Sequence, residues 1–145
     1  MAESIADRRE NTGKLIQELL EERRQVWSLY CKLGAQQPFS ENHPLDQEVQ
    51  EFCQLLIDYI SLGHFGIYRR LTDGSERRQK VLEIAERIYP RIIEATDVAV
   101  EFNDKYEQLA GEALRAELAH DLSKLGEEMA MRNDLEDQLL EAMAS

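Results

Sequence analysis

Cysteine, proline and glycine are scarce in this sequence of 145 residues, with two, three and seven copies. Cys31 and Cys53 stand 22 positions apart and form no Cys-x-x-Cys motif, so neither a disulfide framework nor a structural zinc site is indicated. The few glycines and prolines leave little room for turns, which disfavours an all-β fold. No unbroken run of aliphatic, aromatic, methionine or cysteine residues exceeds three. We therefore expect no secretory signal and no membrane-spanning helix. The cysteine usage indicates a reducing, cytoplasmic location.

Positive charge is also in short supply, because 17 basic side chains face 29 acidic ones and the formal net charge is −12. Phosphate recognition relies on clustered lysine and arginine, so direct binding to nucleic acid is disfavoured. A protein partner with a positively charged surface is favoured instead.

Four segments show the spacing of amphipathic helices, at about residues 12–33, 44–71, 76–109 and 112–142. Residues 1–145 then form one all-α domain, and the short connections predict an antiparallel up-down-up-down four-helix bundle. Pro90 falls inside the third segment, whose apolar series resumes in phase after it. We expect a kink there rather than a break.

The segment 44–71 carries two apolar faces, although one face is enough to bury a helix in a bundle. The first face suits burial and contains Cys53, Leu56, Ile57, Ile60, Ile67, Tyr68 and Leu71. The second contains Leu55, Tyr59, Leu62 and Phe65, with Asp58 among them. Either two neighbours bury this helix and Arg132 or Arg23 pairs with Asp58 inside, or the second face is a binding surface anchored by Asp58.

Several polar residues fall on the core side of their helices. Ser61 and His64 lie toward the core or its margin, and Arg132 falls on the apolar seam of the last segment. Unpaired buried polar groups are costly, so we expect an internal polar network containing His64, Tyr68 and Arg132. If Arg132 is buried, it needs a carboxylate partner.

Motifs for catalysis and metal binding are weak. Glu117 and His120 form one Glu-x-x-His, a motif that di-iron bundles use twice, and the chain holds no second copy. We expect no metal, no cofactor and no enzymatic activity. The alternative is a metal- or small-ligand-binding bundle with Glu117, His120, His64 and Asp58 in an internal cavity.

Three stretches resemble one protein family. Residues 52–68 (FCQLLIDYISLGHFGIY), 88–90 (IYP) and 122–137 (LSKLGEEMAMRNDLED) are similar to the Rsd/AlgQ family of bacterial regulators that bind the primary sigma factor. The resemblance implies a non-enzymatic anti-sigma factor with an all-α bundle.

The resemblance also implies a partner and a site. Family members bind region 4 of the sigma-70 type factor, whose helix-turn-helix reads the −35 promoter element, and so limit its association with core RNA polymerase. The family motif places its important aspartate at Asp58, together with Ser61 and Phe65. We add Leu62 and Leu15 as apolar contacts and expect a monomer that touches neither nucleic acid nor membrane. A scaffold for other cytoplasmic regulatory proteins is a further alternative.

Overall fold

The computed structural model describes residues 5–40 and 45–144, and every regular element within these ranges is helical. The long helices are α1 (Ile5–Gly34), α2 (Leu45–Leu62), α4 (Gln79–Gln108) and α5 (Gly111–Ala144). A π-helical segment η1 (Gly63–Tyr68) and the short α3 (Arg69–Thr72) extend α2. The all-α class expected from the sequence is confirmed. Among residues 5–40 and 45–144, none of the helices combines the length and the hydropathy of a membrane span.

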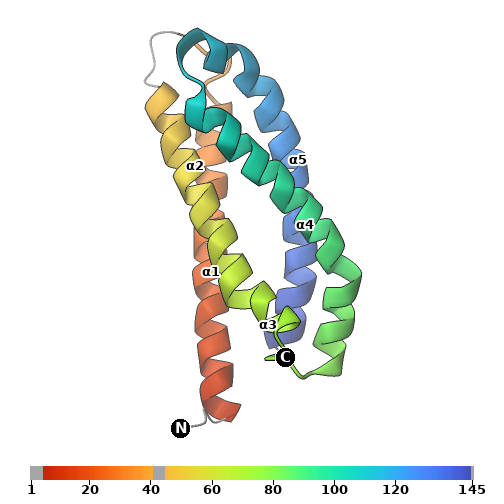
Figure 1. Ribbon diagram of the computed structural model, residues 1–145. Coiled ribbons are helices and arrows are strands. Elements are labelled where there is room, and N and C mark those ends of the chain that lie inside the picture. The colour runs from red at the N-terminus through yellow and green to blue at the C-terminus, as the bar shows by residue number, and fades with distance from the viewer. Residues whose placement is uncertain (1–4, 41–44, 145) are drawn as a thin grey trace.

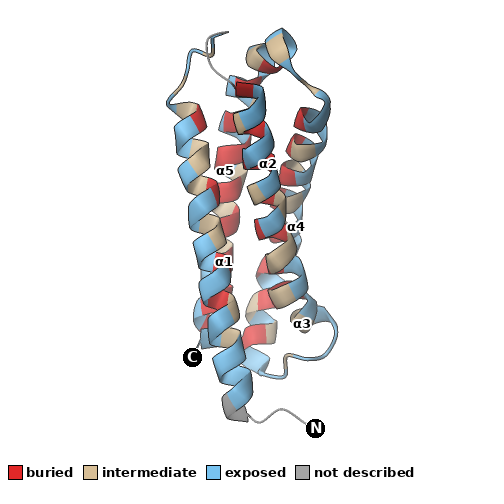
Figure 2. Ribbon diagram, turned by 90° about the vertical axis from the view of Figure 1, so that its left-hand side faces the viewer, coloured by how far each residue is buried: buried red, intermediate tan, exposed pale blue. Residues whose placement is uncertain are grey.

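The four long helices lie side by side in an elongated molecule (Figure 1). In this view α1 leads away from the end where both termini are marked, and α2 returns along it. Helix α4 leads away again from that end and α5 comes back. Buried residues face the middle of the molecule on all four (Figure 2), and one hydrophobic cluster joins them.

The third long helix, α4, shows how the periodicity builds this core. Its buried positions follow the predicted series at spacings of three and four: Val81, Ala85, Ile88, Ile92, Ala95, Ala99, Phe102 and Tyr106. Pro90 is exposed within the continuous helix. The kink at this residue stays a prediction.

Helix boundaries differ from the sequence prediction where apolar residues give no signal. Helix α1 begins at Ile5 rather than near residue 12, because residues 7–11 are polar and carry no apolar stripe for the pattern to detect. The predicted start of the second helix at Pro44 lies outside the described residues. Helix α4 begins at Gln79 rather than 76, since the preceding loop is held by bonds such as Glu76 N to Arg70 O at 3.0 Å.

The π-helical turn is the main departure inside the second helix. Leu62 before it and Arg69 after it have right-handed helical dihedral angles, so the rod continues through η1. Hydrogen bonds in a π-helix reach one residue further than in an α-helix, which inserts an extra residue and rotates the later positions of the helix. Gly63 and Tyr68, five positions apart, are both buried, while His64 is exposed. The expectation that His64 lies inside is therefore wrong.

Candidate partner-binding surface

The outer side of α2 and η1 carries a row of residues at spacings of three and four. Asp58 and Phe65 are exposed, and Ser61 and Leu62 are partly buried between them. Asp58 accepts a hydrogen bond from Gln54 Nε2 at 3.0 Å. Within the described part of the chain no ion pair involves Asp58, so the internal pairing with Arg23 or Arg132 is not formed. With Leu15 of α1, these four residues define what we call the α1–α2 surface.

Phe65 gives this surface an apolar element facing solvent. Its side chain is 64% exposed, against 42% for Ile93, the next most exposed large apolar side chain among the described residues. Its ring meets the His64 ring edge-on, with centroids 4.9 Å apart. Together with the partly buried Leu62 three positions earlier, it gives this side of the helix an apolar area suited to contact with another molecule.

Leu15 joins the surface because α1 packs tightly against the π-helical turn. A Cβ atom added to Gly66 would lie only 2.9 Å from Leu15 Cδ1 and 3.0 Å from Leu15 Cδ2. A larger residue at this position would push the Leu15 side chain aside. Leu15 thus packs against Gly66, the residue after Phe65, and is partly buried against the core.

Glu22 adds unsatisfied negative charge next to Asp58. Burial, then the charges of Asp58 and Glu18, raise the pKa of the Glu22 carboxyl. Its Oε2 atom is buried and has no hydrogen-bond partner within the described residues. Three acidic side chains therefore stand together at one end of the α1–α2 surface, where a cation would be favoured. The sequence prediction missed Glu22, although it lies two helical turns from Leu15 on the same side of α1.

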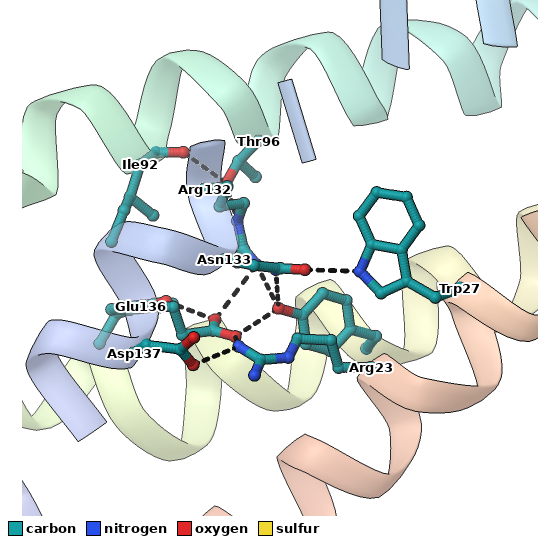
Figure 3. A network of polar contacts seen from close by, with 10 residues as sticks. Arg23, Trp27, Ile92, Thr96, Arg132, Asn133, Glu136 and Asp137 are labelled. Atoms are coloured by element: carbon teal, nitrogen blue, oxygen red, sulfur yellow. Dashed lines mark hydrogen bonds and ion pairs between the residues drawn. The ribbon is translucent and has the colours of Figure 1, made fainter. Parts of the chain in front are cut away.

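Beneath this surface lies a buried polar network centred on Glu136, which is 0% exposed (Figure 3). The Tyr59 hydroxyl donates to Glu136 Oε1, and the Tyr68 hydroxyl donates to Oε2 at 2.7 Å. Arg132 Nη1 donates to Glu136 Oε2 at 3.2 Å and to the Tyr59 hydroxyl at 2.9 Å. Arg23 Nη1 reaches Glu136 Oε1 at 3.3 Å from the edge of the core.

The remaining contacts attach the network to the other helices. Arg132 Nε donates to Thr96 Oγ1 of α4 at 3.1 Å. Asn133 Nδ2 donates to the Tyr59 hydroxyl at 2.9 Å, and its Oδ1 accepts from Trp27 Nε1 of α1 at 2.6 Å. All four long helices therefore meet at this network (Figure 3).

Burial and neighbouring charges fix the protonation states of Arg132, Tyr59 and Tyr68 in this network. Burial lowers the pKa of Arg132, but Tyr68, Tyr59 and Glu136 outweigh it, so the net pKa is raised. Burial, followed by the charge of Glu136, raises the pKa of Tyr59 and of Tyr68 far above the ordinary tyrosine value. Arg132 thus stays protonated and both phenols stay neutral hydrogen-bond donors.

Of the residues predicted for an internal network, the structure brings together Tyr68 and Arg132 through Glu136 and leaves His64 outside. Glu136 was missed. The sequence contains a signal for it, since Glu136 lies four positions after Arg132 on one helix, the spacing of an intrahelical ion pair.

Residues considered for metal binding are dispersed. Glu117, His120, His64 and Asp58 are all exposed, so they line no internal cavity. Glu117 instead pairs with Lys105 Nζ at 3.2 Å. No group of three or more histidine, cysteine, aspartate or glutamate residues in the described ranges could hold a metal ion.

Comparison with known proteins points to one family. Residues 1–144 match the family described as "Regulator of RNA polymerase sigma(70) subunit, Rsd/AlgQ". The chain is 31% identical over 143 residues to the "Regulator of sigma D" of Yersinia enterocolitica, covering 96% of this chain and 86% of that one. It is 32% identical to the protein of the same name from Yersinia pseudotuberculosis, covering 96% and 85%. With the Salmonella paratyphi A protein of that name the identity is 30%, covering 95% and 86%. No solved structure matches the chain.

Proposed function

Because the chain belongs to the Rsd/AlgQ family of regulators of the RNA polymerase sigma(70) subunit, we propose that it is an anti-sigma factor that binds region 4 of the primary sigma factor. Bound region 4 is kept from core RNA polymerase and from the −35 promoter element. The protein acts in the cytoplasm as a monomer, by protein-protein contact alone, without catalysis, cofactor or direct contact with nucleic acid.

The observation that carries this proposal is the state of Asp58. This carboxylate is exposed on the same outer side of the helix as Phe65, about two turns away, and no basic side chain in the described ranges pairs with it. Interface hot spots combine large apolar or aromatic side chains with charged groups that find a partner across the interface, and this side of the helix offers one of each. Both groups are available to a partner without rearrangement of the helices.

The chemistry of the partner complements this surface. A helix-turn-helix exposes arginine and lysine for DNA phosphates and base edges. Asp58 accepts one such arginine, and Glu22, whose Oε2 lacks a partner in the described part of the chain, extends the same acidic end. Apolar surface of region 4 packs against Phe65, Leu62 and Leu15. The half-buried Ser61 lies between these apolar residues and the acidic end. The net charge of −12 steers the basic partner toward the protein.

The test is the replacement Asp58→Ala, measured by calorimetric titration with isolated region 4. We expect the binding free energy to weaken by more than about 1 kcal/mol, about fivefold in Kd, because an arginine loses its partner in a partly desolvated contact. The melting temperature changes little, since the one hydrogen bond of Asp58 within the described residues is the exposed one from Gln54.

Asp104→Ala serves as the matched control, because Asp104 is an exposed aspartate on α4. It removes the same charge and leaves affinity almost unchanged. If both variants lose the same affinity for region 4, Asp58 acts only through long-range electrostatic attraction and not through a direct contact. Undiminished binding of a sigma factor that lacks region 4 would contradict the proposed partner segment.

A further inference from the structure

An open cavity of about 810 Å³ lies at the end of the molecule where both termini are marked (Figure 1). It is bounded by the first turns of α1, by the loop between α3 and α4, and by the last turn of α5. This volume falls within the range of small-molecule sites, which is about 300–1,000 Å³.

Arginine dominates the lining of this cavity. Five of the twelve arginines in the chain line it, namely Arg8, Arg9, Arg70, Arg77 and Arg78. Among the described residues, two acidic ones, Asp73 and Glu76, line it with them. A local positive excess in a chain of net charge −12 runs against the overall composition. The cavity is therefore suited to an anion that the rest of the surface repels.

Two of the arginines are fixed in place by bonds to the protein. Arg70 Nη1 donates to Thr12 Oγ1 of α1 at 2.8 Å. Arg78 donates through Nε to Glu76 Oε1 at 2.9 Å and through Nη2 to the Met143 carbonyl oxygen at 3.1 Å. These contacts join three segments that are distant in sequence, so the cavity is built by the fold and not by a single loop.

The acidic residues of the lining are already engaged, and three arginines are not. Glu76 pairs with Arg78, and Asp73 accepts a bond from the Ser75 backbone N–H at 2.9 Å. Arg8, Arg9 and Arg77 are exposed and take part in no hydrogen bond or ion pair within the described ranges. Their guanidinium groups are open to an external acceptor.

We propose that this cavity binds a small molecule carrying two or more phosphate groups. The planar guanidinium group offers paired N–H donors that match phosphate oxygens, and several arginines around one space favour a multiply charged ligand. A small molecule fits better than a nucleic acid backbone, because the positive charge is confined to one cavity while the whole chain is strongly acidic.

Pyrophosphate is the probe for this proposal, titrated calorimetrically into the full chain at low ionic strength. We expect saturable binding that is stronger than the binding of inorganic phosphate. The double variant Arg9→Gln/Arg77→Gln should weaken it by about tenfold or more, since charge-assisted hydrogen bonds are lost. Thermal melting of the variant should match that of the wild-type chain, because neither side chain makes a bond in the described part.

The matched control is Arg24→Gln/Arg87→Gln, which removes two exposed arginines outside the cavity. It should leave pyrophosphate affinity within about twofold of the wild-type value. Absence of pyrophosphate binding, or equal losses in both double variants, overturns the proposal. The proposal is also overturned if a single-stranded RNA binds through Arg9 and Arg77 and pyrophosphate does not displace it.

Discussion

Among single residues, Glu22 carries a charge for which the described residues supply no hydrogen-bond partner at Oε2. Its pKa is raised from the ordinary value of 4.5, so the folded state binds this proton more tightly than the unfolded state does. Between the ordinary and the raised pKa, the folded state holds more protons and stability falls as pH rises. Above the raised pKa the full penalty persists, so at neutral pH the charge of Glu22 opposes folding.

The replacement Glu22→Gln should separate stability from binding. At pH 7 we expect the free energy of unfolding to rise by about 0.5 kcal/mol, a small amount because solvent still screens the carboxyl. The gain should vanish as pH falls below 4.5, where Glu22 is protonated in both states. Affinity for region 4 should fall about fivefold. Urea unfolding over a pH series and calorimetric titration measure the two effects.

Glu51→Gln is the control for Glu22→Gln, because Glu51 is an exposed glutamate on α2. It should alter neither stability nor affinity appreciably. Loss of stability in Glu22→Gln at pH 7 would mean that this carboxylate has a stabilising partner within the protein, although its Oε2 has none among the residues that the structure describes.

At the scale of elements, the π-helical turn depends on the absence of a side chain at Gly66. Gly66→Ala places a methyl group 2.9 Å from Leu15 Cδ1, so the Leu15 side chain must shift out of its present packing. We expect a loss of about 1–3 kcal/mol of stability by urea denaturation. We also expect weaker binding of region 4, because Leu15 and the neighbouring Phe65 shift together.

Gly13→Ala on α1 is the matched glycine control. Nothing lies within 4 Å of a Cβ at this position, so alanine should stabilise the helix by about 0.5–1 kcal/mol through its higher propensity. Equal stability of the Gly66→Ala and Gly13→Ala proteins would show that the contact with Leu15 is not tight in solution.

The helices were predictable from sequence where apolar residues repeat with the α-helical period, as in the series from Val81 to Tyr106. The π-helical turn was not, because a wheel of fixed period cannot register an inserted residue. The second apolar face led to Asp58 and Phe65 as candidate site residues. Glu22 was not predicted, because its raised pKa depends on burial and on the charges of Asp58 and Glu18, which are its neighbours in space.

At the scale of the whole molecule, the network around Glu136 joins all four long helices in the core. Glu136→Ala leaves Arg132, which is 1% exposed, as a buried charge without its carboxylate. We expect a loss of about 3–5 kcal/mol of stability in chemical denaturation. Asp134→Ala, at an exposed position on the same helix, should cost less than about 0.5 kcal/mol.

Removing both charges provides a second measurement of the same network. The double variant Arg132→Met/Glu136→Leu should lose less stability than the two single changes added together, because neither charge is then left unpaired. Simple additivity in this cycle would show that the two residues do not act as a pair.

The indole of Trp27, the sole tryptophan in the chain, lies at the edge of the Glu136 network. Its N–H donates to Asn133 at 2.6 Å, and its ring meets Tyr30 edge-on with centroids 5.1 Å apart. Intrinsic fluorescence therefore reports from one position, directly beside the Glu136 network. Its emission wavelength can show, without any added label, whether region 4 docks onto a rigid bundle or loosens the junction of the helices underneath.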